Sequence, residues 1–449
     1  MEKVNNICCL GAGYVGGPTM LVMALKNPDI TFNVVDLNIS RISNWNNEDL
    51  DKLPIYEPGL KEIVKKVRNK NLFFSSEIKK SIEDADIIFI AVNTPTINSG
   101  PGKGMASNLE YFDSCASDIK KYSKGFKIIV EKSTVPVKTA ERLSKILSEN
   151  QNNFDFEILS NPEFLAEGTA VNDMLNPDRV LIGGNSSQRG KKSIEALSKL
   201  YEKWIPKSRI LKTNVWSSEL AKLASNAMLA QRISSINSLS ALCEKTGADI
   251  NELSKAIGMD NRIGSKFLKP SPGFGGSCFQ KDLLNLIYIS TFFGLEEVAE
   301  YWNQVLKIND YQRRRIAQIV INSFDESIMG KSILILGWAF KANTDDTRES
   351  SSISITEKLY TKGAKISIYD PKVKKNSILE DISEHWNSFN DGDLKILNSL
   401  ERNISFDAVI VLTEWEEFKN LNFSNECKIF DCRDILNHKK TFYRLGVKS

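Results

Sequence analysis

The chain has 449 residues, more than one globular domain usually holds, so two or three domains are expected. Its 59 basic and 56 acidic residues are spread without a long block of one sign, which gives no support for nucleic-acid or membrane-surface binding. The densest basic cluster, Arg313, Arg314 and Arg315, falls in a helical pattern and is interpreted as a solvated face or a subunit contact.

The start of the chain runs directly into a strand pattern without a secretory signal, and no segment has the length and apolar character of a membrane span. Its seven cysteines form no C-x-x-C pair, so free thiols and a cytoplasmic location are expected. The two histidines, His385 and His438, fall in polar stretches expected to be irregular. No cluster of ligands indicates a metal site, so lysine, carboxylate or a bound water would have to handle protons.

The first part of the chain alternates strand and helix patterns. A strand at 6–10, a glycine turn, a helix at 15–26 and a strand at 32–36 form one β-α-β unit. Further strands are expected at 87–92, 127–131 and 157–160. The alternation predicts an α/β fold with a doubly wound, mostly parallel sheet.

The pattern changes near residue 218, where helical periodicity continues to about 244 without glycine or proline. This segment predicts a long connecting helix, followed by helices near 250–257, 282–291 and 298–323. At 332 the α/β pattern restarts, with a helix after 351 and strands at 365–369, 408–412 and 428–430, and the polar stretch 376–398 is expected to be a surface insertion. We therefore predict two Rossmann-like domains, 1–212 and 329–449, joined by a helical middle domain at 213–328.

The segment Gly11-Ala12-Gly13-Tyr14-Val15-Gly16 has the context of a dinucleotide fingerprint, with a strand before it and a helix after it. Its glycines allow a tight turn, approach of a pyrophosphate and close helix packing. Asp36, at the end of the next strand, would bind ribose hydroxyls and repel a 2′-phosphate, which favours NAD over NADP. Arg41 would soften that repulsion. The second glycine turn, at 337–341, keeps one glycine, so a different nucleotide is expected there, held by side chains such as Lys341.

Cys278 follows the glycine-rich loop 273–276 and precedes an apolar helix. Unpaired amides at a helix N-terminus stabilise negative charge, and Lys281 and Asp282 follow at the spacing of one helix face. In a nicotinamide-binding chain this arrangement suggests covalent capture of an aldehyde by the thiol. A small buried core cysteine is the alternative interpretation.

Other polar residues stand where a site would form. Lys222 and Asn226 are four apart on the long helix, although an amphipathic helix usually carries solvated lysines. Glu163 and Glu167 follow a strand at the edge of the sheet where ligands bind, and exposed loop carboxylates are the alternative. Two more turns at that edge would line the nicotinamide half of the crevice, with residues Val92, Asn93, Thr94, Pro95 and Thr96 in one and Ser133, Thr134 and Val135 in the other.

Taken together, these strings resemble the family of UDP-glucose and GDP-mannose dehydrogenases, and its animal-type members most closely. The resemblance covers nearly the whole chain. It runs from the fingerprint through 56–60, 131–136, 161–168, 216–226, 258–282 and 340–350, and ends at Phe430-Asp431-Cys432-Arg433.

The resemblance implies oxidation of UDP-glucose at its C6 alcohol to UDP-glucuronate, with two NAD reduced per substrate. Cys278 would be the nucleophile that forms a thiohemiacetal and then a thioester. Lys222 would stabilise the oxyanion or shuttle protons and Asp282 would orient or activate water. Glu163 would assist proton transfer, with Thr134 near the reacting carbon.

The same resemblance assigns binding residues. The UDP-sugar would be held by Glu163, Phe164, Leu165, Ala166, Glu167, Lys222, Asn226, Lys269, Phe274, Gly275, Phe340, Lys341 and Arg433. NAD would further contact 92–96, Ser133, Glu167, Cys278, Lys281 and Arg348. Arg262 would reach into the neighbouring subunit's site, which implies at least a dimer. The chain stops at Ser449 without the tail of animal-type members, so the resemblance leaves tail-dependent regulation and the choice between a dimer and a hexamer open.

Two alternatives stay open. A sister dehydrogenase for UDP-N-acetylmannosamine or GDP-mannose would share the cysteine and lysine but differ in its base and its contacts to the sugar. A nucleotide-sugar sensor without catalysis could be built on the same fold, although the complete set of Lys222, Cys278 and Asp282 argues against it.

Overall fold

The computed structural model describes residues 4–148, 155–325, 327–387, 389–390, 394–400, 403–436 and 441–448. The chain divides into two compact units, Met1–Ser225 and Asn226–Ser449. Each unit is an α/β structure built around its own sheet, as expected. The three domain boundaries predicted from the sequence stay a prediction.

The first unit contains a sheet in the order β3-β2-β1-β4-β5-β6-β7-β8, in which only the β6–β7 pair is antiparallel among the described residues. Its strands are β1 (Asn6–Leu10), β2 (Thr31–Val35), β3 (Leu72–Ser75), β4 (Ile87–Ile90), β5 (Lys127–Glu131), β6 (Phe156–Ser160), β7 (Val180–Gly183) and β8 (Ile210–Thr213). Its helices are α1 (Gly16–Lys26), α2 (Ile39–Asn46), α3 (Leu60–Val67), α4 (Ile78–Asp84), α5 (Glu110–Tyr122), α6 (Thr139–Ser148), α7 (Ala170–Leu175) and α8 (Gln188–Tyr201), with short 3-10 turns at Leu50–Lys52 and Lys207–Arg209.

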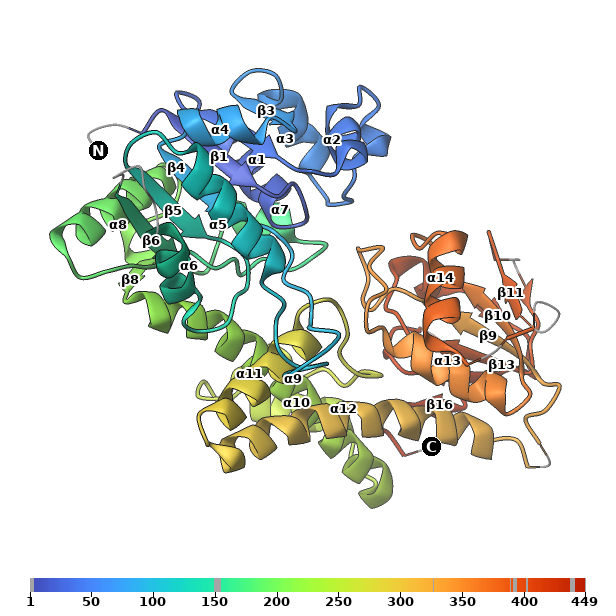
Figure 1. Ribbon diagram of the computed structural model, residues 1–449. Helices are drawn as coiled ribbons and strands as arrows, with labels where there is room; N and C mark the ends of the chain where they lie inside the picture. The colour runs from blue at the N-terminus through green and yellow to red at the C-terminus, as the bar shows by residue number, and fades with distance from the viewer. Residues whose placement is uncertain are drawn as a thin grey trace. The chain divides into compact units, whose positions relative to one another are not determined.

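Strand periodicity sets the two layers of this unit. Ile7 and Cys9 of β1 pack with residues of α1, α3 and α8, whereas Cys8 and Leu10 pack with residues of α4, α5 and α6. Successive side chains of a strand point to opposite faces, so a fully apolar strand requires helices on both sides of the sheet. Figure 1 shows α5 and α6 side by side over one of these faces.

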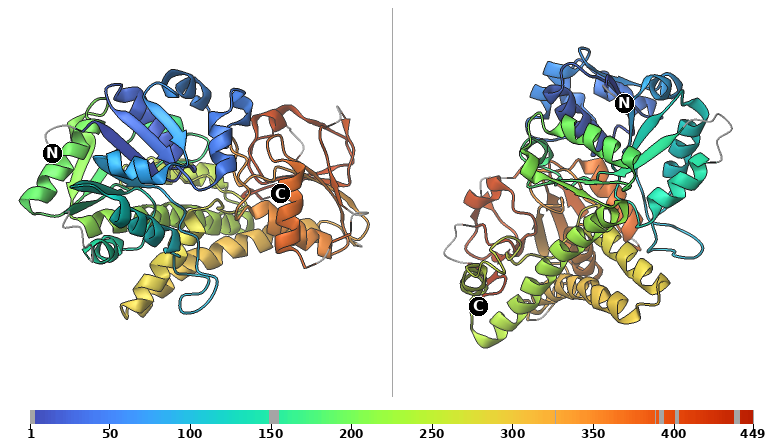
Figure 2. Two further views of the ribbon diagram at one scale, coloured as in Figure 1. Left: turned by 45° about the horizontal axis from the view of Figure 1, so that its top comes forward. Right: turned by 90° about the vertical axis from the view of Figure 1, so that its left-hand side faces the viewer.

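The second unit begins within the long helix α9 (Val215–Thr246), close to the predicted 218–244. Three helices follow, α10 (Ile250–Gly258), α11 (Phe279–Phe292) and α12 (Glu296–Asn322), and α11 and α12 pack against each other. The predicted helices of the middle region are therefore confirmed. Figure 2 shows α9 and α12 as the longest helical ribbons of the chain.

A parallel sheet in the order β11-β10-β9-β13-β15-β16 forms the rest of the second unit. Its strands are β9 (Ser332–Leu336), β10 (Lys365–Tyr369), β11 (Leu394–Ile396), β13 (Ala408–Val411), β15 (Lys428–Asp431) and β16 (Tyr443–Arg444). The remaining elements are α13 (Ser351–Thr361), α14 (Lys375–His385), a 3-10 turn at Glu416–Asn420 and the small pair β12 (Asn403–Ile404) and β14 (Asn422–Phe423).

The expectation of a surface insertion at 376–398 is wrong where the structure describes it. Residues 375–385 form α14, and 394–396 form β11. Ile378 and Ile382, one helical turn apart, are buried in the core of the C-terminal sheet, so two apolar residues are enough to hold an otherwise polar helix. His385 is the last residue of α14 rather than part of an irregular stretch, and His438 lies outside the described residues.

Candidate active site

The glycine turn after β1 has the conformation that a dinucleotide requires. Gly11 has φ +107°, and a Cβ there would lie 2.5 Å from the Ala91 carbonyl oxygen. At Gly16 a Cβ would lie 2.0 Å from the Gly11 carbonyl oxygen, whereas at Gly13 it would meet open space. The N-cap residue of α1, Val15, makes no side-chain cap hydrogen bond, so the N-terminus of the helix suits a pyrophosphate. The residues present therefore fit NAD at this turn.

Asp36 lies beside this turn, directly after β2. Its Oδ2 accepts hydrogen bonds from the Ala12 amide and from Arg41 Nη1, each at 2.9 Å. Arg41 is thus bound to the carboxylate that would contact the ribose. Tyr14 and Val15 pack at the edge of the core below the turn.

The turns after β4 and β5 are bonded to each other. Ser133 Oγ donates to the Val92 carbonyl at 2.6 Å, and Thr94 Oγ1 donates to the Thr134 carbonyl at 2.8 Å. Val135 is buried in the core beneath α4, α5 and α6. Because Thr94 and Ser133 are themselves almost fully buried, these bonds fix the backbone of both turns. Asn93 and Pro95 flank Thr94 in this turn, and Thr96 pairs with Ser107 through an isolated bridge.

Glu163, three residues after the end of β6, forms a buried ion pair that the sequence did not reveal. Its Oε2 lies 2.7 Å from Lys132 Nζ, and the two side chains are 15% and 3% exposed. Burial acts to raise the pKa of Glu163, but the charge and hydrogen bond of Lys132 outweigh it and hold that pKa below its usual value. Burial acts to lower the pKa of Lys132, and Glu163 with Tyr201 raises it. The carboxylate is therefore ionised at neutral pH.

The segment after Glu163 is held in place by several contacts. The amides of Phe164 and Leu165 donate to Glu163 Oε1 at 2.8 and 3.2 Å, and the Arg179 guanidinium lies 3.9 Å from the centre of the Phe164 ring. The Ala166 amide donates to Asp173 at 3.0 Å. Gly168, after Glu167, donates its amide to Glu57 at 2.6 Å.

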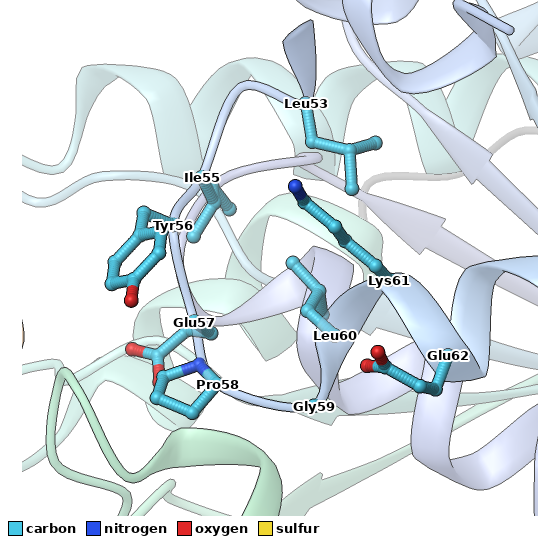
Figure 3. A pocket seen from close by; sticks show the side chains of 9 residues that line it. All are labelled: Leu53, Ile55, Tyr56, Glu57, Pro58, Gly59, Leu60, Lys61 and Glu62. Carbon is cyan, nitrogen blue, oxygen red and sulfur yellow. The ribbon is translucent and has the colours of Figure 1, made fainter. Parts of the chain in front are cut away.

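Glu57 belongs to a segment that also lines a pocket of about 210 Å³, shown in Figure 3. The pocket is lined by Leu53, Ile55, Tyr56, Glu57, Pro58, Gly59, Leu60, Lys61 and Glu62, and none of these is a predicted site residue. Glu57 is buried, and its carboxylate accepts the amides of Gly168 and Ala170, so it positions the start of α7. Its role is thus to fix the loop that carries Glu163 and Glu167.

Lys222 of α9 is buried, so the alternative of a solvated lysine is wrong. Its Nζ lies 5.4 Å from the centre of the Phe164 ring. A buried ammonium over an aromatic face is an ordered cation next to the Glu163 loop.

In the second unit, Cys278 is the N-cap residue of α11, one turn before Asp282. The thiol is exposed and its Sγ lies 3.4 Å from Ser277 Oγ, so the alternative of a buried core cysteine is wrong. Asp282 is 1% exposed and accepts a 2.6 Å hydrogen bond from Asn226 Nδ2 of α9. Lys281 Nζ lies 4.0 Å from the same carboxylate. The exposed thiol is therefore followed, one turn later, by a buried and oriented carboxylate.

The loop before Cys278 packs tightly against the turn 340–351. A Cβ at Gly275 would lie 2.5 Å from the Glu349 carbonyl oxygen, and one at Gly276 would lie 2.8 Å from the Phe340 ring. The Phe274 side chain is buried with α9, α11 and α12, and its amide donates to Asn309 at 2.8 Å. Only glycine allows the two segments to approach this closely.

Arg313 corrects the interpretation of the arginine cluster as a solvated face. Its side chain is 11% exposed, and its Nη2 donates to the carbonyls of Phe274 and Glu349, each at 2.8 Å. Arg315 is 10% exposed and pairs with Glu244 at 2.6 Å. Only Arg314 of the three is exposed. A cluster of basic residues in a helical sequence does not reveal which of their side chains are buried.

The second nucleotide turn differs from the first, as expected. Asp370 at the end of β10 accepts the amides of Trp338 and Ala339 at 2.7 and 3.0 Å, and the Trp415 indole at 3.1 Å. Its Oδ1 also accepts the amides of Lys372 and Val373, so five donors bind this carboxylate. Asp36, the corresponding residue of the first unit, accepts three hydrogen bonds.

Five further cations of the second unit are predicted binding residues. Arg433 donates to the carbonyls of Leu412 and Phe340 at 2.7 and 3.1 Å, and Lys341 Nζ lies 5.5 Å from the Phe340 ring centre. Arg348 pairs with Asp346 at 2.7 Å. Lys269 and Arg262 are exposed, and Arg262 pairs with Asp260 at 2.6 Å.

Within the ranges described, no group of three His, Cys, Asp or Glu side chains could hold a metal ion. The helices in those ranges include none that is long and apolar enough to cross a membrane.

The fold and the first glycine turn define an NAD-binding dehydrogenase with a second, altered nucleotide-binding unit. Three sequence profiles match the chain: the NAD binding domain of the UDP-glucose/GDP-mannose dehydrogenase family at residues 5–205, its central domain at 216–311 and its UDP binding domain at 334–438. The chain belongs to the UDP-glucose/GDP-mannose dehydrogenase family.

Individual relatives agree with this assignment. The chain is 53% identical over 449 residues to UDP-glucose 6-dehydrogenase of Drosophila melanogaster, covering 97% of this chain and 93% of that protein. It is also 53% identical to UDP-glucose 6-dehydrogenase of Gallus gallus, covering 97% and 90%. A solved UDP-glucose dehydrogenase from Pyrobaculum islandicum matches with a TM-score of 0.86 at 27% identity, covering 100% of this chain and 99% of that chain.

Proposed function

We propose that the chain oxidises UDP-glucose at C6 to UDP-glucuronate and reduces two NAD per substrate. The observation that carries this proposal is the 53% identity, over 97% of the chain, to proteins named UDP-glucose 6-dehydrogenase. The glycine turn at 11–16, which fits a pyrophosphate, supports NAD as the cofactor. When bound, NAD accepts the hydride in each of the two oxidations.

Cys278 is proposed as the nucleophile. Its exposed sulfur would add to the C6 aldehyde formed in the first oxidation and give a thiohemiacetal. Loss of the second hydride from C6 gives a thioester, and attack by water breaks the C–S bond, releases the acid and returns the thiol. The position of Cys278 at the N-terminus of α11 supports this role, because a helix N-terminus favours negative charge.

The remaining catalytic roles are proposed for groups held in fixed positions. Asp282, oriented by Asn226, would orient or activate the hydrolytic water. Glu163, kept ionised by Lys132, would accept a proton, with Thr134 near the reacting carbon. Lys222 would stabilise the oxyanion or shuttle a proton.

Binding roles are proposed along the same lines. NAD would use 11–16, Asp36, Arg41, 92–96, 133–135, Glu167, Lys281 and Arg348. The UDP-sugar would use 163–167, Asn226, Lys269, 274–275, Phe340, Lys341 and Arg433. The saturated Asp370 supports a nucleotide mode in the second unit that relies on side chains.

The stoichiometry of the reaction tests the scheme. NADH formed is measured against UDP-glucose consumed with the full chain, and two NADH per substrate are expected. A ratio of one would refute the thioester route even if UDP-glucose were the substrate. Turnover of GDP-mannose or UDP-N-acetylmannosamine without turnover of UDP-glucose would show that UDP-glucose is not the substrate.

Replacing the nucleophile gives a second test. Cys278→Ser should bind NAD and UDP-glucose with little change and lose at least about 1,000-fold in kcat, because serine is a far weaker nucleophile without a base. Isothermal titration and NADH formation measure the two quantities. Steady UDP-glucuronate production by this variant would remove Cys278 from the nucleophile role.

We also propose that the chain forms at least a dimer, with Arg262 completing the neighbouring subunit's site. The exposed position of Arg262 supports this role. A cytoplasmic location is proposed because all seven cysteines are unpaired. The three-domain division at 1–212, 213–328 and 329–449 is part of the same proposal.

A further inference from the structure

Two buried carboxyl groups meet in the first unit, where none of the proposed catalytic steps uses them. Glu131 is the last residue of β5 and is 1% exposed, and Glu219 lies near the start of α9 and is 2% exposed. Ser218 of α9 donates to the Ser160 carbonyl of β6, the residue paired with Glu131 in the sheet. The start of α9 is therefore packed directly against the ends of β5 and β6.

Glu219 is the carboxyl group of the pair that accepts backbone hydrogen bonds. Its Oε2 accepts the Lys138 amide at 2.7 Å, and its Oε1 accepts the Ala140 amide at 2.8 Å. These amides belong to the start of α6, where the helix N-terminus favours negative charge. Each of its two oxygens thus has a backbone donor.

Glu131 has the opposite environment. Both of its carboxyl oxygens are buried, and no donor reaches either of them in the part of the chain that the structure describes. Its side chain is within hydrogen-bonding distance of Glu219, and this contact becomes a hydrogen bond only when a proton lies between the two groups. Two ionised carboxylates buried in contact repel strongly, so one of them has to be neutral.

Nearby charges do not supply the missing partner. Lys138, the cation acting on Glu219, has a half-exposed side chain that pairs with Glu141 at 3.2 Å. Lys132, next to Glu131 in the chain, pairs with Glu163 instead. Burial first, and then the charge of Glu219, raise the pKa of Glu131 well above its usual value, and burial also raises the pKa of Glu219.

We propose that Glu131 and Glu219 share one proton at neutral pH, and that this proton joins the turn carrying Thr134 to the turn of α9 carrying Lys222. Thr134 follows Glu131 by three residues, and Lys222 follows Glu219 by three residues, close to one helical turn. Both glutamates are positioning residues. The link to catalysis rests on the proposed function, whereas the shared proton does not.

Glu131→Gln tests the shared proton. The amide has nearly the same shape and donates an N–H to Glu219 without a titratable proton. In the wild type, the folded chain keeps this proton above about pH 4.3, where the unfolded chain has lost it, so stability falls as the pH rises toward the folded pKa. Glu131→Gln has no such proton, so its stability does not show this fall with pH. Its thermal midpoint relative to wild type should therefore rise by about 2 °C or more between about pH 5.5 and pH 9.

The difference in thermal midpoint between Glu131→Gln and wild type is taken at each pH. The contributions of the other titrating groups cancel in this difference, because those groups are the same in both proteins. A midpoint difference that does not change with pH would overturn the proposal. This readout involves no substrate, so it is independent of whether UDP-glucose is the substrate.

Glu131→Leu separates the hydrogen bond from packing. Leucine fills the site but cannot bond to Glu219, so kcat should fall by about 10-fold or more, whereas Glu131→Gln should stay within about 3-fold of wild type at neutral pH. Equal kcat for the two variants would exclude the link between the two turns. If Glu131→Leu does not fold, the pH dependence of Glu131→Gln still decides the proposal.

Discussion

At the scale of single residues, Lys132 determines the charge of Glu163. A carboxyl group this deeply buried would be neutral without a partner, but the ammonium 2.7 Å away reverses the effect of burial on its pKa. Glu163 can therefore accept a proton at neutral pH, and donates one only after accepting it. Its contribution to the thioester route depends on a residue that does not contact the reacting carbon in the proposed scheme.

Lys132→Met should raise the pKa of Glu163, since burial is then unopposed by the nearest cation. The acidic limb of the pH profile of kcat should move to higher pH, and kcat at pH 7 should fall by about 10-fold or more. Breaking a buried pair should also cost about 3–5 kcal/mol of stability. The measurements are kcat from about pH 5 to pH 9 and the urea midpoint.

Lys132→Arg is the matched control, because it keeps the charge and changes only the shape of the cation. Its acidic limb should stay at the wild-type position even if kcat falls. If the acidic limb of the kcat profile did not move in Lys132→Met, Lys132 would not set the ionisation of Glu163.

At the scale of elements, α12 holds the loop that precedes Cys278, the proposed nucleophile. Arg313 binds the carbonyls of Phe274 and Glu349, and Asn309 binds the Phe274 amide. Arg313→Met should loosen this loop, because both carbonyls lose the guanidinium donor and the Phe274 carbonyl keeps only the longer hydrogen bond from Asn309 Nδ2, at 3.2 Å. Hydrogen exchange of the Phe274 and Gly276 amides should become about 10-fold faster or more, and kcat should fall more than the NAD affinity changes.

Arg314→Met on the same helix provides the comparison, since Arg314 is exposed. It should leave exchange in 273–277 and kcat unchanged. Arg313→Lys should recover only part of the function, because a lysine cannot reproduce the fork of a guanidinium. If Arg313→Met exchanged at the rate of Arg314→Met, α12 would not hold the loop.

The elements also show which parts of the fold can be predicted from sequence patterns. The long helix, the first β-α-β unit and the fingerprint follow from local patterns, because periodicity and glycine spacing are properties of neighbouring residues. Helix α14 was missed because its burial rests on Ile378 and Ile382 alone. Lys132 and Glu131 were missed as partners, since their surroundings are Glu163 and Glu219, which are far away in sequence.

At the scale of the whole molecule, the two units differ in the turn after their first strand, β1 in one and β9 in the other. In the first, Asp36 follows β2 beside a turn with three glycines and accepts three hydrogen bonds. In the second, Asp370 follows β10 and accepts five, from four amides and an indole. A carboxylate whose lone pairs are all occupied has none left for ribose hydroxyls, which supports our proposal that the second unit binds its nucleotide through cations such as Lys341 and Arg433. In that proposal, one chain carries two nucleotide sites of different chemistry.

The proposed dimer predicts complementation between two inactive variants. Arg262→Ala should lack the cation for its neighbour's site, and Cys278→Ser lacks its own nucleophile. In a mixed dimer, the subunit with intact Cys278 receives Arg262 from the Cys278→Ser subunit and regains activity. Random mixing of equal amounts should therefore restore about a quarter of wild-type activity, because half of the dimers are mixed and each has one complete site.

The measurement is NADH formation by the two variants co-expressed, compared with each variant alone at the same total concentration. Recovery has to arise from mixed dimers, since neither parent dimer contains a complete site. Cys278→Ser co-expressed with a second copy that carries both substitutions is the control, and it should stay inactive. Activity no greater than the sum of the separate variants would mean that Arg262, which pairs with Asp260, serves the site of its own chain.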